Sequence, residues 1–235
     1  MALSTIAEEA SSKDDDCVQT VDVNSPEPQM KPYQRTFNSP AAILGLISLG
    51  TVFLSLSIPT LAFGSVDPPS LIVVIATFYG GIAQTIVAVW EMSLGNTFSA
   101  TVFATYGGFD FVYSAFCLPR IALAAADTVD GVVRQQLYNA IGIYLAIWSS
   151  ITFLLLLGAL QTNIPYVVTH ACIVCALACL SLNAFTGHLH LAIAGGVLGI
   201  IASFSAYYSA FSFFWTQHTS FRFIHFPLMM APFNV

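Results

Sequence analysis

Long apolar runs alternate with polar segments from residue 40 to residue 214. Six runs are long enough to cross the hydrocarbon core of a bilayer, which takes about 20 helical residues. They cover residues 40–58, 70–92, 96–118, 137–160, 165–185 and 189–214. Because lipid offers the backbone no hydrogen-bond partner, each run is expected to be a helix. The pattern predicts an all-α membrane protein in which residues 37–214 form a six-transmembrane-helix bundle.

Polar tails are expected on both sides of this bundle. Residues 1–36 are acidic, rich in Ser, Pro and Glu, and poor in aromatic residues, which is typical of a disordered tail. They lack the apolar core after a basic start that marks a cleaved signal peptide. Seven of the 12 acidic residues precede Pro32, so the net charge of −6 mostly describes this tail. Residues 215–235 are expected to form a short C-terminal tail.

The basic residues predict the orientation. Four basic residues flank the ends of the bundle, namely Lys13, Lys31, Arg35 and Arg222. The other two, Arg120 and Arg134, lie in the loop after the third run. An even number of spans places both termini on one side, and the positive-inside rule favours the cytoplasm. The sequence contains no basic patch, so nucleic acid is not an expected partner.

The apolar runs contain no Lys or Arg, in a chain that is 57% hydrophobic and 8% charged. A bare carboxylate is penalised heavily in such a medium. A carrier without fixed positive charge must keep an anion partly hydrated, solvate it with polar groups and helix ends, or move it with a proton. This favours a small, weakly acidic solute. The polar groups that can serve it are Tyr79, Gln84, Thr105, Tyr106, Ser181 and Asn183.

Two carboxyl groups fall within the runs. Asp110 lies inside the third run and is a candidate proton acceptor, since charge in a membrane is costly and usually functional. The alternative is a protonated side chain bonded to a neighbouring helix. Glu91 lies near the cytoplasmic end of the second run and is expected to sit in interfacial water.

Two runs open with helix-capping residues. Asn38 and Ser39 precede Pro40, and Asn96 and Thr97 open the third run. Such residues accept from free amides at a helix start, which also attracts anions. Simple capping is the alternative to an anion site.

Small residues and cysteines have ordinary explanations as well. Gly195 and Gly199 form a GxxxG pair, which indicates packing within the chain, an oligomer contact or a thin wall beside a pore. His170 and three cysteines share the fifth run, where core packing is expected rather than a metal site. We find no disulfide framework and no catalytic motif, so the chain is expected not to be an enzyme and to need no cofactor or metal.

A longer pattern spans the second and third runs. It reads Phe78-Tyr79-Gly80-Gly81-Ile82-Ala83-Gln84, then Glu91, then Gly95-Asn96-Thr97-Phe98, then Thr105-Tyr106-Gly107. This pattern strongly resembles the acetate transporter family, also called the succinate–acetate permease family. The long polar N-terminal tail resembles its fungal branch.

The resemblance implies six helices around a narrow central pore in each subunit, usually assembled as a homo-hexamer in the plasma membrane. It also implies movement of acetate and related monocarboxylates, sometimes succinate, as an anion channel or by proton symport. The family's hydrophobic gate matches Tyr106, with Ile173 where leucine is typical and Leu49 where phenylalanine is typical. Hydrophobic constrictions gate by dewetting, so these changes preserve the apolar character of the gate.

The chain departs from the family at two places. The signature before the first run is altered over residues 38–46, and Asp110 stands where the family usually has Trp. The first hypothesis is a channel-like or proton-coupled monocarboxylate transporter. The alternative is a non-transporting membrane sensor or an ammonium- or acetate-signalling protein. The proposed substrate-binding residues are Asn38, Tyr79, Gln84, Glu91, Asn96, Thr97 and Tyr106.

Overall fold

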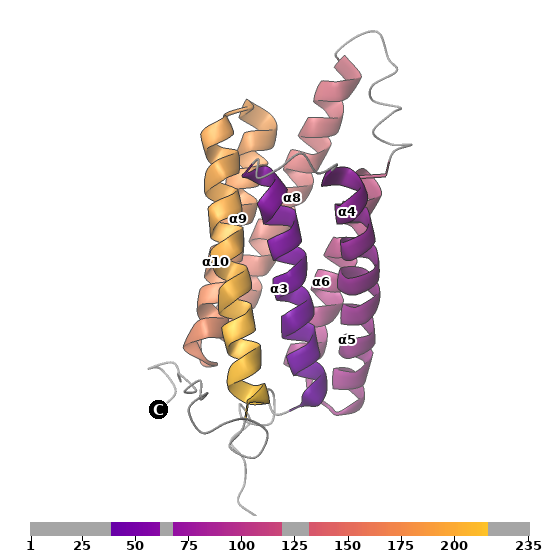
Figure 1. Cartoon of the computed structure of the whole chain (residues 1–235), viewed down its shortest axis with the longest axis vertical. Helices are drawn as coiled ribbons and strands as arrows, with labels where there is room; N and C mark the ends of the chain where they lie inside the picture. The colour runs from indigo at the N-terminus through magenta and orange to yellow at the C-terminus, as the bar shows by residue number, and fades with distance from the viewer. Residues whose placement is uncertain (1–38, 62–67, 119–131, 216–235) are drawn as a thin grey trace, which may run out of the picture. The chain divides into compact units, whose positions relative to one another are not determined.

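The computed structural model describes residues 39–61, 68–118 and 132–215, and the regular structure in these segments is helical (Figure 1). The helices are α3 (Pro40–Thr60), α4 (Pro68–Val74), η2 (Ile75–Ala83), α5 (Gln84–Ser93), α6 (Thr97–Phe116), α8 (Val132–Ala159), α9 (Ile164–Thr186) and α10 (Leu189–Phe214). The all-α prediction is confirmed for these residues. The predicted N-terminal tail, and the C-terminal tail beyond Trp215, lie outside them.

Five helical segments among the described residues are long and apolar enough to cross a membrane. They are Pro40–Thr60, Leu71–Ser93, Gln135–Ala159, Ile164–Thr186 and Leu189–Phe214. They match five of the six predicted runs to within a few residues, and the protein is thus a multi-pass helical membrane protein. The third run forms α6, a 20-residue helix that is absent from this set. Its Thr, Ser and Tyr residues and Asp110 make it more polar, so a sixth span stays a prediction.

Several predicted helix boundaries differ from the structure, most of all the start of the fourth run, since α8 begins at Val132 rather than at residue 137. The first run was expected to end at residue 58, before Pro59, but α3 continues to Thr60 with Pro59 inside its last turn. The proline forgoes its own backbone hydrogen bond to the preceding turn, and the helix ends one residue after it. The second run begins at Pro68 and consists of α4, η2 and α5 in succession. η2 is a π-helical stretch of nine residues, which hydrophobic periodicity does not reveal.

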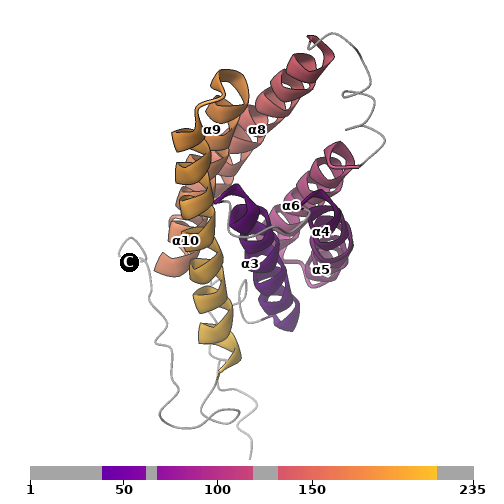
Figure 2. The ribbon, with the colours of Figure 1, turned by 45° about the horizontal axis from the view of Figure 1, so that its top comes forward.

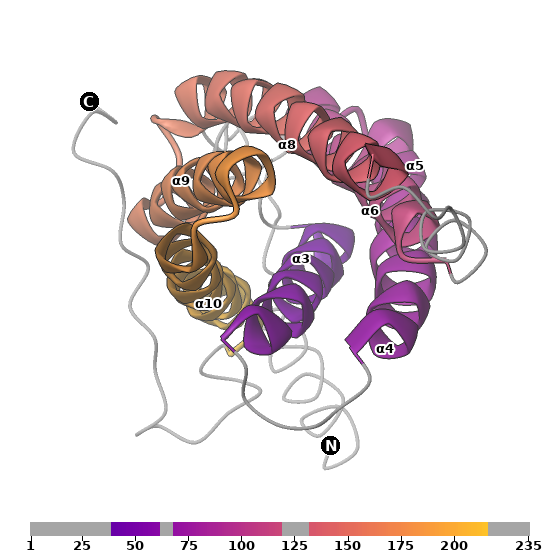
Figure 3. The same ribbon diagram turned by 90° about the horizontal axis from the view of Figure 1, so that it is seen from above.

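The helices pack as neighbours around α3, α6 and α9. α3 contacts α10 on one side and the α4–η2–α5 segment on the other, while α6 packs against η2 and α5 (Figure 3). α9 contacts both α8 and α10, and Figure 2 shows α8 inclined to these two helices. Ala42 near the start of α3 and Ala210 near the end of α10 share one apolar cluster. We call this end of the bundle the termini end.

The outer helix α8 buries one stripe and exposes much of the rest, whereas α3, which has neighbours on both sides, is buried over more of its surface. On α8 the buried positions recur at Leu145, Thr152 and Ala159, seven residues apart, which keeps them on one face of a helix. The outer surface is strongly apolar: Phe78, Trp90 and many other large hydrophobic side chains are more than half exposed. Such a surface suits lipid or apolar contacts with another subunit.

Candidate functional site

Three helices begin at the termini end with a side-chain cap. Ser39 caps α3 by accepting from the Ala41 amide at 3.2 Å, and Asn96 caps α6 by accepting from Ser99 at 3.4 Å. Asn163 caps α9 by accepting from Tyr166 at 2.9 Å. The capping role expected at the first two helix starts is therefore observed. Asn38 lies outside the described residues.

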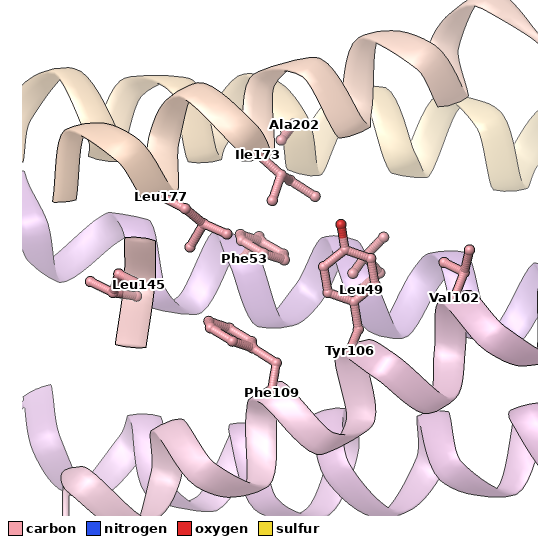
Figure 4. Packing of buried hydrophobic residues seen from close by; sticks show 9 residues of the cluster. All are labelled: Leu49, Phe53, Val102, Tyr106, Phe109, Leu145, Ile173, Leu177 and Ala202. Atoms are coloured by element: carbon pink, nitrogen blue, oxygen red, sulfur yellow. The ribbon is translucent and has the colours of Figure 1, made fainter. Parts of the chain in front are cut away.

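The expected gate residues occupy equivalent positions on these three helices. Leu49, Tyr106 and Ile173 each lie ten residues after the capping residue of their helix. At 1.5 Å of rise per residue, ten residues bring all three to about the same depth. All three are at most 1% exposed and belong to one cluster. Figure 4 shows the Tyr106 hydroxyl directed toward Ile173 and α9. We call these three residues the constriction.

A second layer of large side chains lies next to the constriction on the side away from the termini end. The Phe53 ring contacts Tyr106 edge-on at 6.1 Å between centroids and stacks with Phe109 at 6.3 Å. Phe109 also packs against Tyr144 and Trp148 on α8. These rings fill the space between α3, α6 and α8 next to the constriction.

A cavity of about 270 Å³ adjoins these rings. It extends from Phe53 and Phe109 to Thr60 and Asn183, which lie at the end of the bundle opposite the termini. Its lining is mostly apolar and consists of Phe53, Leu56, Ser57, Thr60, Phe109, Tyr113, Tyr138, Ile141, Leu145, Ala176, Leu177, Leu180, Asn183, Ala184, Ala192, Gly195, Gly196 and Gly199. The volume suits a small organic solute.

The GxxxG pair forms a wall of this cavity. A Cβ on Gly195 would meet Leu180 of α9 at 2.8 Å, and one on Gly199 would collide with Ser57 of α3. These glycines therefore bring α10 against α9 and α3. Packing within the chain and a thin wall beside a cavity, two of the explanations considered from the sequence, both describe what the structure shows.

Two further predicted residues, Gln84 and Asp110, form a buried pair away from the cavity. Gln84 Nε2 donates to Asp110 Oδ2 at 3.2 Å, and both side chains are at most 1% exposed. Asp110 Oδ1 and Gln84 Oε1 have no hydrogen-bond partner within the described part of the chain. A Cβ on Gly80 would collide with the Asp110 carboxyl, so this glycine makes room for the pair.

Glu91 and Asn96 form a second buried pair at the termini end. Asn96 Nδ2 donates to Glu91 Oε2, while its Oδ1 caps α6. Glu91 is fully buried, so the expectation that it sits in interfacial water was wrong. The loop between α5 and α6 folds back, because the backbone N–H of Asn96 donates to the backbone carbonyl of Glu91 at 3.0 Å. This turn directs the Glu91 side chain inward.

The other predicted residues lie apart from the constriction. The Tyr79 side chain is half-buried, and its carbonyl accepts from the Ser48 hydroxyl at 2.5 Å. Thr97 is exposed in the first turn of α6. Ser181 is buried, but its hydroxyl already donates a hydrogen bond to the Gly142 carbonyl at 2.7 Å.

Sequence reasoning missed two polar residues beside Tyr106. Thr152 on α8 lies next to the Tyr106 hydroxyl, and the His170 ring lies 5.9 Å from the Tyr106 ring. Both side chains are fully buried. His170 was assigned to core packing together with the nearby cysteines. Their positions in the sequence could have indicated them. Thr152 is the one polar residue in a row of buried residues spaced seven apart on α8, and His170 lies three residues before Ile173.

The fold and the apolar constriction define a multi-pass helical membrane protein with an internal cavity. The GPR1/FUN34/yaaH family model matches residues 23–232, and the chain therefore belongs to that family. This confirms the resemblance to the acetate transporter family, and the assignment agrees with the expectation that the chain is not an enzyme.

Fungal and bacterial proteins are similar to this chain. It is 32% identical over 189 residues to the "Ammonia transport outward protein 2" of Saccharomyces cerevisiae, covering 80% of this chain and 66% of that protein. It is 28% identical over 203 residues to "Acetate permease A" of Emericella nidulans, covering 82% and 68%. The chain thus spans slightly less than two thirds of the first relative. The solved structure of the bacterial acetate channel SatP has the same fold, with a TM-score of 0.68, 24% identity, and coverage of 82% of this chain and 98% of that chain.

Proposed function

We propose that the protein moves acetate and related small monocarboxylates, with succinate as a larger candidate, across a membrane. The observation that carries the proposal is the apolar constriction of Leu49, Tyr106 and Ile173 beside a cavity of about 270 Å³. The names of a fungal relative and of the solved bacterial structure support acetate as the solute.

The chemistry of the interior suits a weak acid. None of the lysine or arginine side chains is among those that the structure describes, so no fixed cation compensates an anion along this part of the chain. An acid that crosses as the neutral molecule, or with a hydrated carboxylate, avoids most of the charge penalty. Large polyanions lack both options.

The site residues predicted from the sequence have separate roles in this proposal. Tyr106, Leu49 and Ile173 control passage, and Asp110 holds a proton beside Gln84. Glu91, Asn96 and Thr97 lie at the termini end, where a solute enters or leaves between helix starts, with Asn38 just before α3. Tyr79 positions η2 through its carbonyl.

Three features of the cellular context belong to the same proposal. α6 is the sixth span, both termini are cytoplasmic, and the protein assembles as a homo-oligomer, a hexamer by family resemblance, in the lipid of the plasma membrane. The exposed apolar side chains of α5, α8 and α10 support contact with lipid or neighbouring subunits.

The decisive measurement is uptake of labelled acetate by liposomes that contain the purified chain. Uptake above that of protein-free vesicles supports transport, and its absence removes the proposal. Tyr106→Ala is expected to increase the uptake of acetate, and to increase that of the larger succinate by a greater factor, because it widens the constriction. Phe204→Ala, which removes an exposed ring of similar size on α10, is the matched control. Unchanged uptake and selectivity in Tyr106→Ala would exclude Tyr106 from the pathway.

A second candidate is an ammonium- or acetate-linked signalling protein that does not transport acetate. The name of the S. cerevisiae relative refers to ammonia, and this supports ammonium as a second candidate solute to be tested. The same liposomes distinguish the two, because a sensor binds acetate or ammonium without moving either solute faster than protein-free vesicles do.

A further inference from the structure

Three buried polar atoms at the constriction have no hydrogen-bond partner within the described residues. They are the Tyr106 hydroxyl, the Thr152 hydroxyl and His170 Nε2, and they come from α6, α8 and α9. All three side chains are at most 1% exposed. Buried polar atoms are nearly always satisfied, and each orphan costs about 1–3 kcal/mol. The Tyr106 and Thr152 hydroxyls lie beside each other without good hydrogen-bonding geometry, and His170 Nε2 has no described donor, so another molecule can complete this site.

His170 offers an acceptor in this site. Its Nδ1 lies 3.0 Å from the Tyr166 carbonyl oxygen. A carbonyl oxygen only accepts, so Nδ1 carries the hydrogen of that bond. In the uncharged ring Nε2 is then a bare acceptor that requires a donor. The Tyr166 and Tyr106 rings pack against the imidazole at 4.3 Å and 5.9 Å and hold it in place.

Thr152 and Tyr106 supply the complementary groups. Each hydroxyl can donate one hydrogen bond and accept others. Most other buried serine and threonine hydroxyls of the bundle donate to a backbone carbonyl, as Thr169 does to Pro165 at 2.8 Å. Thr152 forms no such bond, although it lies mid-helix where the carbonyl four residues earlier is available. Its hydroxyl thus remains available next to Tyr106.

We propose that His170, Thr152 and Tyr106 form a binding site for the protonated, uncharged form of a carboxylic acid. The inference rests on the proposed function and locates the recognition step within it. The acid O–H donates to His170 Nε2, and the acid carbonyl oxygen accepts from the Tyr106 or Thr152 hydroxyl. The methyl group of acetic acid contacts Leu49 and Ile173. No covalent bond changes, and the acid proton travels with its oxygen.

The same groups disfavour the anion. A carboxylate offers only acceptors, so it would face the Nε2 lone pair. No Lys or Arg side chain is described near the site, and the two described carboxyl side chains, Glu91 and Asp110, belong to their own pairs. The constriction therefore selects the neutral acid without a permanent positive charge.

The first test removes each polar atom at nearly constant volume. Thr152→Val, His170→Phe and Tyr106→Phe are each expected to slow acetate uptake by liposomes about fivefold to tenfold, the value of one hydrogen bond. Their melting temperatures in detergent should hold or rise, because an orphan atom is lost. His170→Gln, whose side chain can present an acceptor near the Nε2 position, should recover part of the rate.

The control for the loss of a buried hydroxyl is Thr169→Val, next to His170 in the sequence. The Thr169 hydroxyl already donates to the Pro165 carbonyl. This variant should leave uptake unchanged. Equal uptake by wild type, Thr152→Val and His170→Phe would overturn the site and indicate that water alone fills it. Slow uptake accompanied by a matching loss of stability would likewise assign these residues to packing.

The second test separates the acid from its anion. Trifluoroacetate resembles acetate in shape but is the anion of a far stronger acid, so at any given pH its protonated fraction is far smaller than that of acetate. Wild type is expected to take up acetate and to exclude trifluoroacetate, and His170→Phe should reduce this preference. Equal uptake of both ions by wild type would overturn neutral-acid recognition. Acetate uptake no faster than through protein-free vesicles would instead reject the proposed function itself.

Discussion

Asp110 and Glu91, the two described carboxyl side chains, are both buried without a described basic side chain beside them. Each is paired with an amide, Asp110 with Gln84 and Glu91 with Asn96. An amide satisfies a neutral carboxylic acid as both donor and acceptor, whereas it only partly compensates a carboxylate. This arrangement favours a proton on Asp110 Oδ1, because that proton would supply the donor that Gln84 Oε1 lacks among the described residues.

Substitution of Asp110 tests this directly. Asp110→Asn places an amide where the protonated acid would be and can close both hydrogen bonds to Gln84, so thermal unfolding in detergent should be unchanged or shifted upward. Asp110→Leu leaves Gln84 unpaired and is expected to cost about 1–3 kcal/mol. A loss in Asp110→Asn as large as in Asp110→Leu would show that the side chain functions as a charged group.

The sequence indicated these residues but not their pairing. A carboxyl within an apolar run is visible by inspection, and Asp110 was identified that way. Its partner lies 26 residues earlier on a separate helix, and that proximity depends on how α5 and α6 pack. The error on Glu91 has the same cause, because run boundaries place a residue along the membrane normal but do not show which way it faces.

At the scale of elements, the second span packs on α6 through both the π-helical stretch and α5. η2 contains the adjacent glycines Gly80 and Gly81, whose Cβ positions are filled by Asp110 and Phe111 of α6. π-Helical turns are rare and often mark functional sites. The sequence motif was recognised, but its conformation was not, because π and α turns share the same composition.

Gly80→Ala and Gly108→Ala form a matched pair for this contact. A Cβ at Gly80 collides with the Asp110 carboxyl, whereas a Cβ at Gly108 meets nothing within 4 Å. Gly80→Ala is expected to lower the free energy of unfolding by about 1–3 kcal/mol. Gly108→Ala should leave it equal or slightly higher, since alanine favours the helix. Equal stability of both variants in detergent melts would refute close packing of η2 on α6.

The three capped helices show a repeat that the sequence alone did not reveal. Tyr-Gly-Gly occurs at residues 79–81 and again at 106–108, which is too short to prove internal duplication. In the structure α3, α6 and α9 begin at one end, each with a side-chain cap, and each contributes one constriction residue ten positions later. The repeat is one of geometry, in which equal spacing from the helix start replaces sequence similarity.

For the whole molecule, the number of spans decides the topology. Five described segments qualify as spans by length and apolarity, and α6 does not because it concentrates polar residues toward the interior. α6 is nevertheless a 20-residue helix that buries Ser99, Tyr106, Asp110 and Ser114 against its neighbours, while Thr97 and Thr101 in its first turns are exposed. A helix enclosed by others needs less apolar surface than one surrounded by lipid.

Reporters fused to the two ends of the chain distinguish the alternatives. Six spans place both ends on one side, and the positive-inside rule makes that side cytoplasmic. Protease protection in membrane vesicles is therefore expected to be the same for both reporters. Opposite accessibility would indicate five spans and would remove α6 from the membrane.

The amino-acid sequence by itself determined that the chain is helical and membrane-embedded, where most spans begin and end, and which family it belongs to. These properties depend on the length of apolar runs, on capping residues and on local motifs, all of which are encoded by neighbouring residues. Only the tertiary structure decided that Glu91 is buried, that Asp110 meets Gln84, and that Tyr106, Thr152 and His170 leave polar atoms unpaired at one depth. Those outcomes depend on which faces of distant helices meet, and in an interior this apolar the position of a few polar atoms is set by packing rather than by any local pattern.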